Sequence, residues 1–175
     1  TFGRKMVDQE IYVFKNFKNP LIQKMIYEIK YNGNKSTAYV LGVELGSLIK
    51  KSKNVVDFDI IIPVPVSKLK KEHRGYNQCQ LIAEGISNII KLPVDSNYLI
   101  RNNNMNSQIK SSRYERWLNV ENEYQLIKEL RYDTKILLVD DVITTGATIN
   151  SCLNAIQKNN KLKVTVAALA GNKFT

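Results

Sequence analysis

The segment from Lys135 to Leu169 constrains the fold more than any other part of the chain. It begins with the apolar run Lys-Ile-Leu-Leu-Val, passes through a turn of threonine and glycine, and continues with apolar residues at helical spacing. A second apolar run starts at Lys163. Two buried strands joined by a helix run parallel and are connected by a right-handed crossover. The segment therefore predicts an α/β fold with a mainly parallel sheet.

The rest of the chain predicts further elements of the same kind. The run at 59–65, Asp-Ile-Ile-Ile-Pro-Val-Pro, is continuous and β-branched, as expected for a strand buried on both faces. At 175 residues the chain suits one domain, 1–175. In chain order we expect a strand at 11–14, a helix from Pro20 that ends at Gly33, a helix at 37–50, the strand 59–65, a basic loop at 67–74, a helix at 77–90 and a strand ending at Ile100.

Composition narrows the class of protein without choosing its ligand. The net charge is +10, which favours anionic partners such as phosphorylated metabolites or nucleic acid. Cys79 and Cys152 lie in apolar helical patterns and are expected to be buried and reduced. No apolar run reaches the roughly 18 residues of a membrane span, and no Cys/His cluster has zinc spacing. We therefore expect a cytoplasmic protein without membrane insertion.

Two carboxylates and a hydroxyl-rich loop follow the strand that starts at Lys135. We expect Asp140 and Asp141 at the end of this strand, where ligands of open α/β sheets bind. The loop 143–148, Ile-Thr-Thr-Gly-Ala-Thr, opens into a helix, whose N-terminal N–H groups and dipole favour an anion. Singly, such a loop is often only a helix cap, and such a pair only a solvated turn. Together they indicate donors for a phosphate beside acceptors for sugar hydroxyls.

The same acidic pair after an apolar strand also occurs in response-regulator receivers. Those proteins need a phospho-accepting aspartate on a later strand. No acidic residue follows Asp141 in this sequence. The receiver interpretation is therefore excluded.

The segment 136–148 resembles the signature for 5-phosphoribosyl-1-pyrophosphate (PRPP) of type I phosphoribosyltransferases. The resemblance implies a three-layer α/β fold, with a central, mainly parallel sheet flanked by helices. It implies that Asp140 and Asp141 are the catalytic pair and contact the ribose hydroxyls. Mg²⁺ is the implied cofactor, held mainly by substrate oxygens and not by a protein cage. The implied 5′-phosphate site consists of Ile143, Thr144, Thr145, Gly146, Ala147 and Thr148.

A second segment resembles the ComF family, a branch of this superfamily associated with bacterial DNA uptake. It combines a Pro-Val-Pro strand end, basic residues and the run Arg-Gly-Tyr-Asn-Gln at 74–78. Gln108, Arg116 and Asn119 match later family positions in order. The resemblance implies a pyrophosphate site formed by Val66, Ser67, Lys68 and Arg74. Lys70 and Lys71 fit either this site or a solvated basic loop.

The superfamily also covers its site with a mobile loop, which corresponds here to about 101–116. The resemblance implies Arg101, Lys110 and Arg113 as candidates in that loop. His73 is either an exposed loop residue or a general base. It lies among basic residues, which disfavour its protonated form.

Residues 1–35 correspond to a hood region that recognises the acceptor in this superfamily, and nothing in them identifies that acceptor. No cysteine precedes Cys79, so the cysteine-rich zinc module of many ComF members is absent from these residues. Members of the superfamily often form homodimers.

Three functions fit these motifs. The leading prediction is a Mg²⁺-dependent enzyme that transfers a phosphoribosyl group from PRPP to an unidentified acceptor and releases pyrophosphate. The alternative is a non-catalytic ComF-like accessory protein of natural competence, with single-stranded DNA or the competence machinery as its partner. A PRPP-sensing regulator is disfavoured, because the chain shows no helix-turn-helix pattern.

Overall fold

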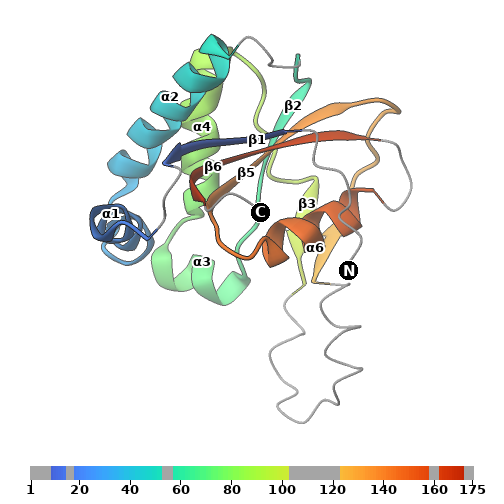
Figure 1. Ribbon diagram of the computed structural model, residues 1–175. Coiled ribbons are helices and arrows are strands. Elements are labelled where there is room, and N and C mark those ends of the chain that lie inside the picture. The colour runs from blue at the N-terminus through green and yellow to red at the C-terminus, as the bar shows by residue number, and fades with distance from the viewer. Residues whose placement is uncertain (1–8, 15–17, 53–56, 103–122, 158–161, 172–175) are drawn as a thin grey trace.

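A parallel sheet forms the centre of the computed structural model, which describes residues 9–14, 18–52, 57–102, 123–157 and 162–171 (Figure 1). In this part of the chain the sheet has four strands in the order β1-β6-β5-β2, all parallel. A separate antiparallel pair is formed by β3 and β4. The predicted parallel α/β sheet is confirmed. The strands are β1 Gln9–Phe14, β2 Ile60–Pro63, β3 Leu99–Arg101, β4 Tyr124–Leu126, β5 Lys135–Ile143 and β6 Lys163–Gly171.

Helices cover both faces of the central sheet, which gives the expected three layers (Figure 1). On one face lie α1 (Pro20–Tyr31), α2 (Lys35–Lys51) and α4 (Gln78–Ile90). On the other lie α6 (Ala147–Ile156) and the β3–β4 pair. The short helix α3 (Lys68–Arg74) follows β2. None of the described helices is long and apolar enough to cross a membrane.

Strand β5 divides the core by the alternation of its side chains. Ile136 and Leu138 pack in the cluster that includes α6, β3 and β4. Leu137 and Val139 pack in the cluster that includes α1, α2 and α4. Both layers are therefore attached to the same strand, immediately before its two acidic residues.

Glycines bring α2 and α4 into backbone contact. A Cβ atom at Gly42 would overlap the backbone carbonyl of Ile82, and one at Gly85 would overlap that of Tyr39. Backbone atoms cannot rotate away as a side chain does. This helix pair is consequently packed with no room for an added methyl group.

The prediction of a basic loop at 67–74 is wrong, because this segment forms helix α3. The Ser67 hydroxyl caps this helix by accepting from the N–H of Lys70 at 3.4 Å, and Gly75 ends it with a φ of 76°. None of its residues is buried. A helix without an apolar face leaves no hydrophobic period in the sequence.

The strand predicted to end at the acidic pair continues two residues beyond it, to Ile143. Asp140 pairs with Ala168 of β6 and Ile143 with Gly171, so both acids lie within β5. The neighbouring strand β2 ends earlier, at Pro63 opposite Val139. The acids therefore lie among the last four residues of β5, just beyond the carboxyl end of β2, and the shorter neighbour leaves space beside them.

Candidate functional site

A pocket of about 160 Å³ lies beside the acidic pair, where β2 has ended. Its wall combines the segment after β2, the α3–α4 junction, the end of β5 and single residues from α1, β3 and β4. A smaller pocket of about 30 Å³ adjoins it, formed by Asp140 and residues 142–149. Asp140, Val142 and Thr148 line both pockets. The two hollows therefore meet at Asp140.

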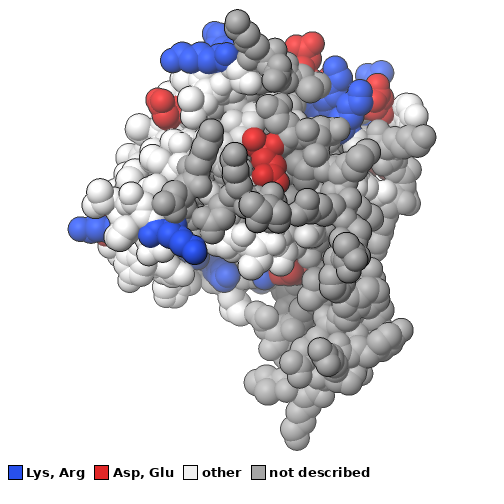
Figure 2. Space-filling model, in the orientation of Figure 1, with Lys and Arg blue, Asp and Glu red and all other residues white. Residues whose placement is uncertain are grey.

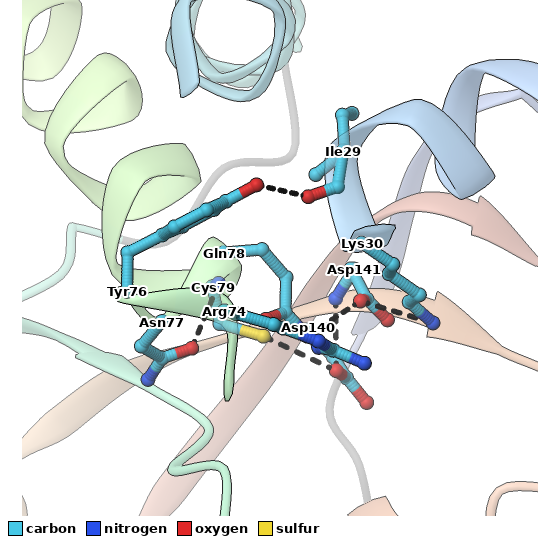
Figure 3. A network of polar contacts seen from close by, with 9 residues as sticks. All are labelled: Ile29, Lys30, Arg74, Tyr76, Asn77, Gln78, Cys79, Asp140 and Asp141. Atoms are coloured by element: carbon cyan, nitrogen blue, oxygen red, sulfur yellow. Dashed lines mark hydrogen bonds and ion pairs between the residues drawn. The ribbon is translucent and has the colours of Figure 1, made fainter. Parts of the chain in front are cut away.

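Asp141 is buried and is held by two donors from the α1–α4 side of the sheet (Figure 3). The Nε2 group of Gln78 donates to Asp141 Oδ2 at 2.7 Å. The ammonium group of Lys30 lies 3.1 Å from the same oxygen. One amide and one cation thus fix this carboxylate within the pocket.

Asp140, the preceding residue on the strand, has different partners. Its Oδ1 accepts from the backbone N–H of Asp141 at 2.8 Å and from the thiol of Cys79 at 3.4 Å. Burial, and then the charge of Asp141, raise the pKa of Asp140 to about 7. Burial and the charge of Asp140 in turn raise the pKa of the Cys79 thiol, which remains a neutral donor. Asp140 is therefore harder to ionise than an aspartate in water.

Four basic side chains line the larger pocket: Lys30, Lys70, Arg74 and Arg101. Arg74 Nη1 donates to Gln78 Oε1 at 2.8 Å, and its guanidinium group lies over the ring of Tyr31. Arg101 is paired with Glu123 at 2.5 Å. An anion in this pocket would meet positive charge from several elements.

The residues that the resemblance assigned to pyrophosphate are divided by the structure. Val66 and Arg74 line the pocket. Ser67 does not, because its hydroxyl caps α3. Lys68 is exposed and lies 3.9 Å from Glu72, whereas Lys70, two residues further along α3, lines the pocket.

Of the mobile-loop candidates, Arg101 lies in the pocket wall. Lys110 and Arg113 are outside the described residues, as are the family positions Gln108, Arg116 and Asn119.

The loop between β5 and α6 has the form of an anion cradle. Gly146 stands at the N-cap of α6 with a φ of 74° and has no side chain to cap the helix. Thr144, Thr145, Ala147 and Thr148 are exposed around the smaller pocket. The Thr145 hydroxyl accepts from the N–H of Ala147 at 3.4 Å, and the N-terminus of this ten-residue helix presents the positive end of its dipole to a ligand or solvent.

Sequence reasoning missed several pocket residues. Lys30 and Tyr124 come from segments far from either motif, and Cys79 reads as an ordinary core residue. Gln78 carried a signal, since it belongs to the Arg-Gly-Tyr-Asn-Gln run, but nothing in that run gives its partners. His73 is exposed at the end of α3 and is absent from the wall of either pocket.

A Mg²⁺ ion would find few protein ligands here. No group of three or more His, Cys, Asp or Glu side chains within the described ranges is arranged to hold a metal. Among the described residues that line the pocket, Asp140 and Asp141 supply the carboxylates, beside four basic residues. This donor set fits an ion coordinated mostly by substrate oxygens and water, with Asp140 or Asp141 as an outer support.

Comparison with known proteins gives relatives of one kind. No family model matches the chain. It is 33% identical over 115 residues to competence protein F of Haemophilus influenzae, covering 64% of this chain and 50% of that protein. It is 28% identical over 151 residues to competence protein ComFC of Bacillus subtilis, covering 82% and 56%. The chain thus spans about half the length of these two relatives.

Among solved structures, the chain is similar to glutamine PRPP amidotransferase from B. subtilis, complexed with ADP and GMP. The TM-score is 0.54 at 17% identity, over 80% of this chain and 30% of that one. At this identity the likeness extends to the fold alone.

Proposed function

We infer from its similarity to the ComF competence proteins that the chain is a ComF-like member of the type I phosphoribosyltransferase superfamily, and we propose that it binds PRPP and transfers the phosphoribosyl group to an acceptor. The observation that carries the proposal is that Asp140 is shared by the loop pocket and the cationic pocket. PRPP carries a phosphate, a ribose and a pyrophosphate in series. The site offers an N–H cradle, two carboxylates and basic side chains in the same series.

Each part of the site would have a separate task. The loop 143–148 would bind the 5′-phosphate, and Asp140 and Asp141 would accept hydrogen bonds from the ribose hydroxyls. Lys70, Arg74 and Arg101 would neutralise the pyrophosphate. Bound Mg²⁺ would add positive charge to the same oxygens.

In the reaction, the bond from ribose C1 to pyrophosphate breaks and a bond from C1 to the acceptor forms. The protein would contribute mainly alignment of the reactants and stabilisation of the departing negative charge.

The pocket must change to admit this ligand. Its volume of about 160 Å³ is below the roughly 300–1,000 Å³ of typical small-molecule sites. The ion pair of Lys30 and Asp141 lies in the pocket wall. We expect Lys30 to move from Asp141 when the ribose hydroxyls bind.

Calorimetric titration with PRPP, with and without Mg²⁺, tests the proposal. We expect Mg²⁺-dependent binding that is weakened at least a hundredfold in the Asp140→Asn/Asp141→Asn double variant, because neutral amides are weaker acceptors than carboxylates. Asp133→Asn is the control, since this exposed residue is outside both pockets and Asn tolerates its φ of 67°. Equal binding by wild type and double variant would refute the assignment. Release of pyrophosphate with a panel of acceptors would then test turnover.

A second function, in DNA uptake, is favoured by the printed names of the relatives and by the net charge of +10. On the face in Figure 2, the basic groups of the described residues stand apart from one another, with acidic groups between them. A salt-sensitive shift of labelled single-stranded DNA, without any PRPP binding, would make this the better proposal. No shift at low salt would remove direct DNA binding.

A further inference from the structure

Gln78 lies between a basic and an acidic side chain of the pocket, Arg74 and Asp141. It is the first residue of α4 and is 4% exposed. Its side chain accepts from Arg74 Nη1 at 2.8 Å and donates to Asp141 Oδ2 at 2.7 Å (Figure 3). A cation and a carboxylate that line one pocket are therefore joined through a single buried amide.

The partners of Gln78 fix the orientation of its amide. A guanidinium group can only donate, and an ionised carboxylate can only accept. The amide oxygen must face Arg74 and the amide nitrogen must face Asp141. The reverse orientation would oppose donor to donor and acceptor to acceptor.

Other side chains would serve only one partner or neither. Glutamate would accept from Arg74 but repel Asp141, and methionine has similar length but no hydrogen-bonding amide. Asparagine is shorter by one methylene group. Glutamine alone among these matches both partners in reach and in hydrogen-bonding pattern.

The backbone at Gln78 is itself held in place. The Asn77 side chain caps α4 by accepting from the N–H of Cys79 at 3.0 Å, and it donates to the carbonyl of Val64 at 3.1 Å. Val64 lies in the pocket wall directly after β2. The start of α4 is thus tied to the strand end, and the Gln78 side chain begins from a fixed point.

We propose that Gln78 is a positioning residue that couples Arg74 to Asp141, so that the anion-binding cation and the ribose-binding carboxylate are aligned together. The proposal rests on the proposed function for the roles of those two partners. Gln78 itself need not touch the substrate. Lys30 of α1 also contacts the Asp141 carboxylate, so loss of Gln78 would leave this carboxylate with Lys30 and without its amide donor.

The first test needs no ligand. The guanidinium ¹⁵N signals of Arg74 and the carboxyl ¹³C signal of Asp141 are recorded at pH 7.5 in the wild type and three variants. In Gln78→Met both signals should change. In Gln78→Glu the Arg74 signals should keep their hydrogen-bonded form, while the Asp141 signal changes. Gln80→Met is the matched control, because Gln80 is on the same helix but bonds to Glu84 at 3.1 Å, and neither signal should change.

The different responses of the Arg74 and Asp141 signals to Gln78→Glu distinguish a hydrogen-bonding role of Gln78 from a role in packing alone. If both Gln78 variants leave both signals as in the wild type, the coupling is refuted. If Gln78→Met does not fold, the Gln78→Glu variant still decides, since loss of the Arg74 signal or an unchanged Asp141 signal would contradict the inference.

The second test measures Mg²⁺-dependent PRPP binding by calorimetry. We expect binding to be roughly tenfold to a hundredfold weaker in Gln78→Met and unchanged in Gln80→Met. Wild-type binding that Gln78→Met leaves intact would overturn the positioning role. A wild type that binds no PRPP would instead overturn the proposed function, while the ligand-free signals would still establish or refute the coupling.

Discussion

The α2–α4 layer and the pocket beside β5 lie on the same sheet, but the first is made of apolar and backbone contacts and the second of polar and charged side chains. The helix pair meets through backbone contacts at Gly42 and Gly85 and apolar side chains around them. The pocket is lined by hydrogen-bonded acids, an amide and basic residues. Strand β5 supplies both, with apolar residues up to Val139 and the acids immediately after. We therefore expect the effect of a substitution on stability to depend on side-chain volume in the helix layer and on charge in the pocket.

The sharpest test of charge in the pocket is the pH dependence of an Asp140→Asn variant. The pKa of Asp140 is raised from 3.8 to about 7. The contribution of this residue to the free energy of unfolding is therefore fully present below about pH 4 and is lost as the pH rises to 7. Asparagine does not titrate. The variant's advantage in unfolding free energy should therefore grow by about 3 kcal/mol from pH 4.5 to 7.5 and then stay constant. Urea unfolding across this range measures it.

Asp95→Asn provides a control of opposite sign. The N–H of Asn97, and then Lys128, lower the pKa of Asp95. This half-buried carboxylate contributes stability above the ordinary pKa of aspartate, and the contribution is lost as the pH falls. Asp95→Asn should be less stable than wild type at pH 7.5 and should approach it in acid. A difference for Asp140→Asn that is independent of pH would remove the contrast between the regions.

Volume in the helix layer is tested by Gly85→Ala. The added methyl group would overlap backbone atoms of α2, at a cost of about 3 kcal/mol, partly offset by about 1 kcal/mol of better helix propensity. A net loss of about 2 kcal/mol in urea unfolding is expected, and it should not vary between pH 4.5 and 7.5. Asn88→Ala, at an exposed position of the same helix, should be neutral or slightly stabilising. A Gly85→Ala variant as stable as wild type would show that the helices can separate cheaply.

The smallest effect concerns two adjacent lysines. Lys70 lines the pocket, whereas Lys71 is exposed elsewhere on α3. Lys70→Met should weaken PRPP binding about fivefold, with a reduced salt dependence, because one partly screened cation is lost. Lys71→Met should bind as the wild type does. Equal losses in the two variants would mean that the general charge of α3 matters, and not its contact with the pocket.

The central fold was predictable because its elements carry local signals. The apolar runs of β2, β5 and β6 and the capping asparagines before α1 and α4 stand in the sequence. Helix α3 could not be predicted, since it has no buried face. The continuation of β5 through Asp141 was also hidden, because charge normally ends an apolar run. That extension depends on pairing with β6, which is a long-range contact.

The candidate site was predictable only in part, for the same reason. Asp140, Asp141 and the loop to Thr148 form one continuous motif whose chemistry can be read locally. Lys30 lies more than a hundred positions before Asp141, and only the folded chain brings them to 3.1 Å. The choice of Lys70 over Lys68 depends on which way a helix turns, and this helix was read as a loop.

Successive side chains on a strand face opposite layers, and Asp140 and Asp141 are successive. Asp141 is reached from α1 and α4, whereas Asp140 also borders the loop that begins α6. A ligand bound by both acids would connect helices on the two sides of the sheet through its contacts with Asp140 and Asp141. Its arrival should slow amide hydrogen exchange at the start of α4 and at the start of α6 together. A ligand held by only one acid would protect only one side.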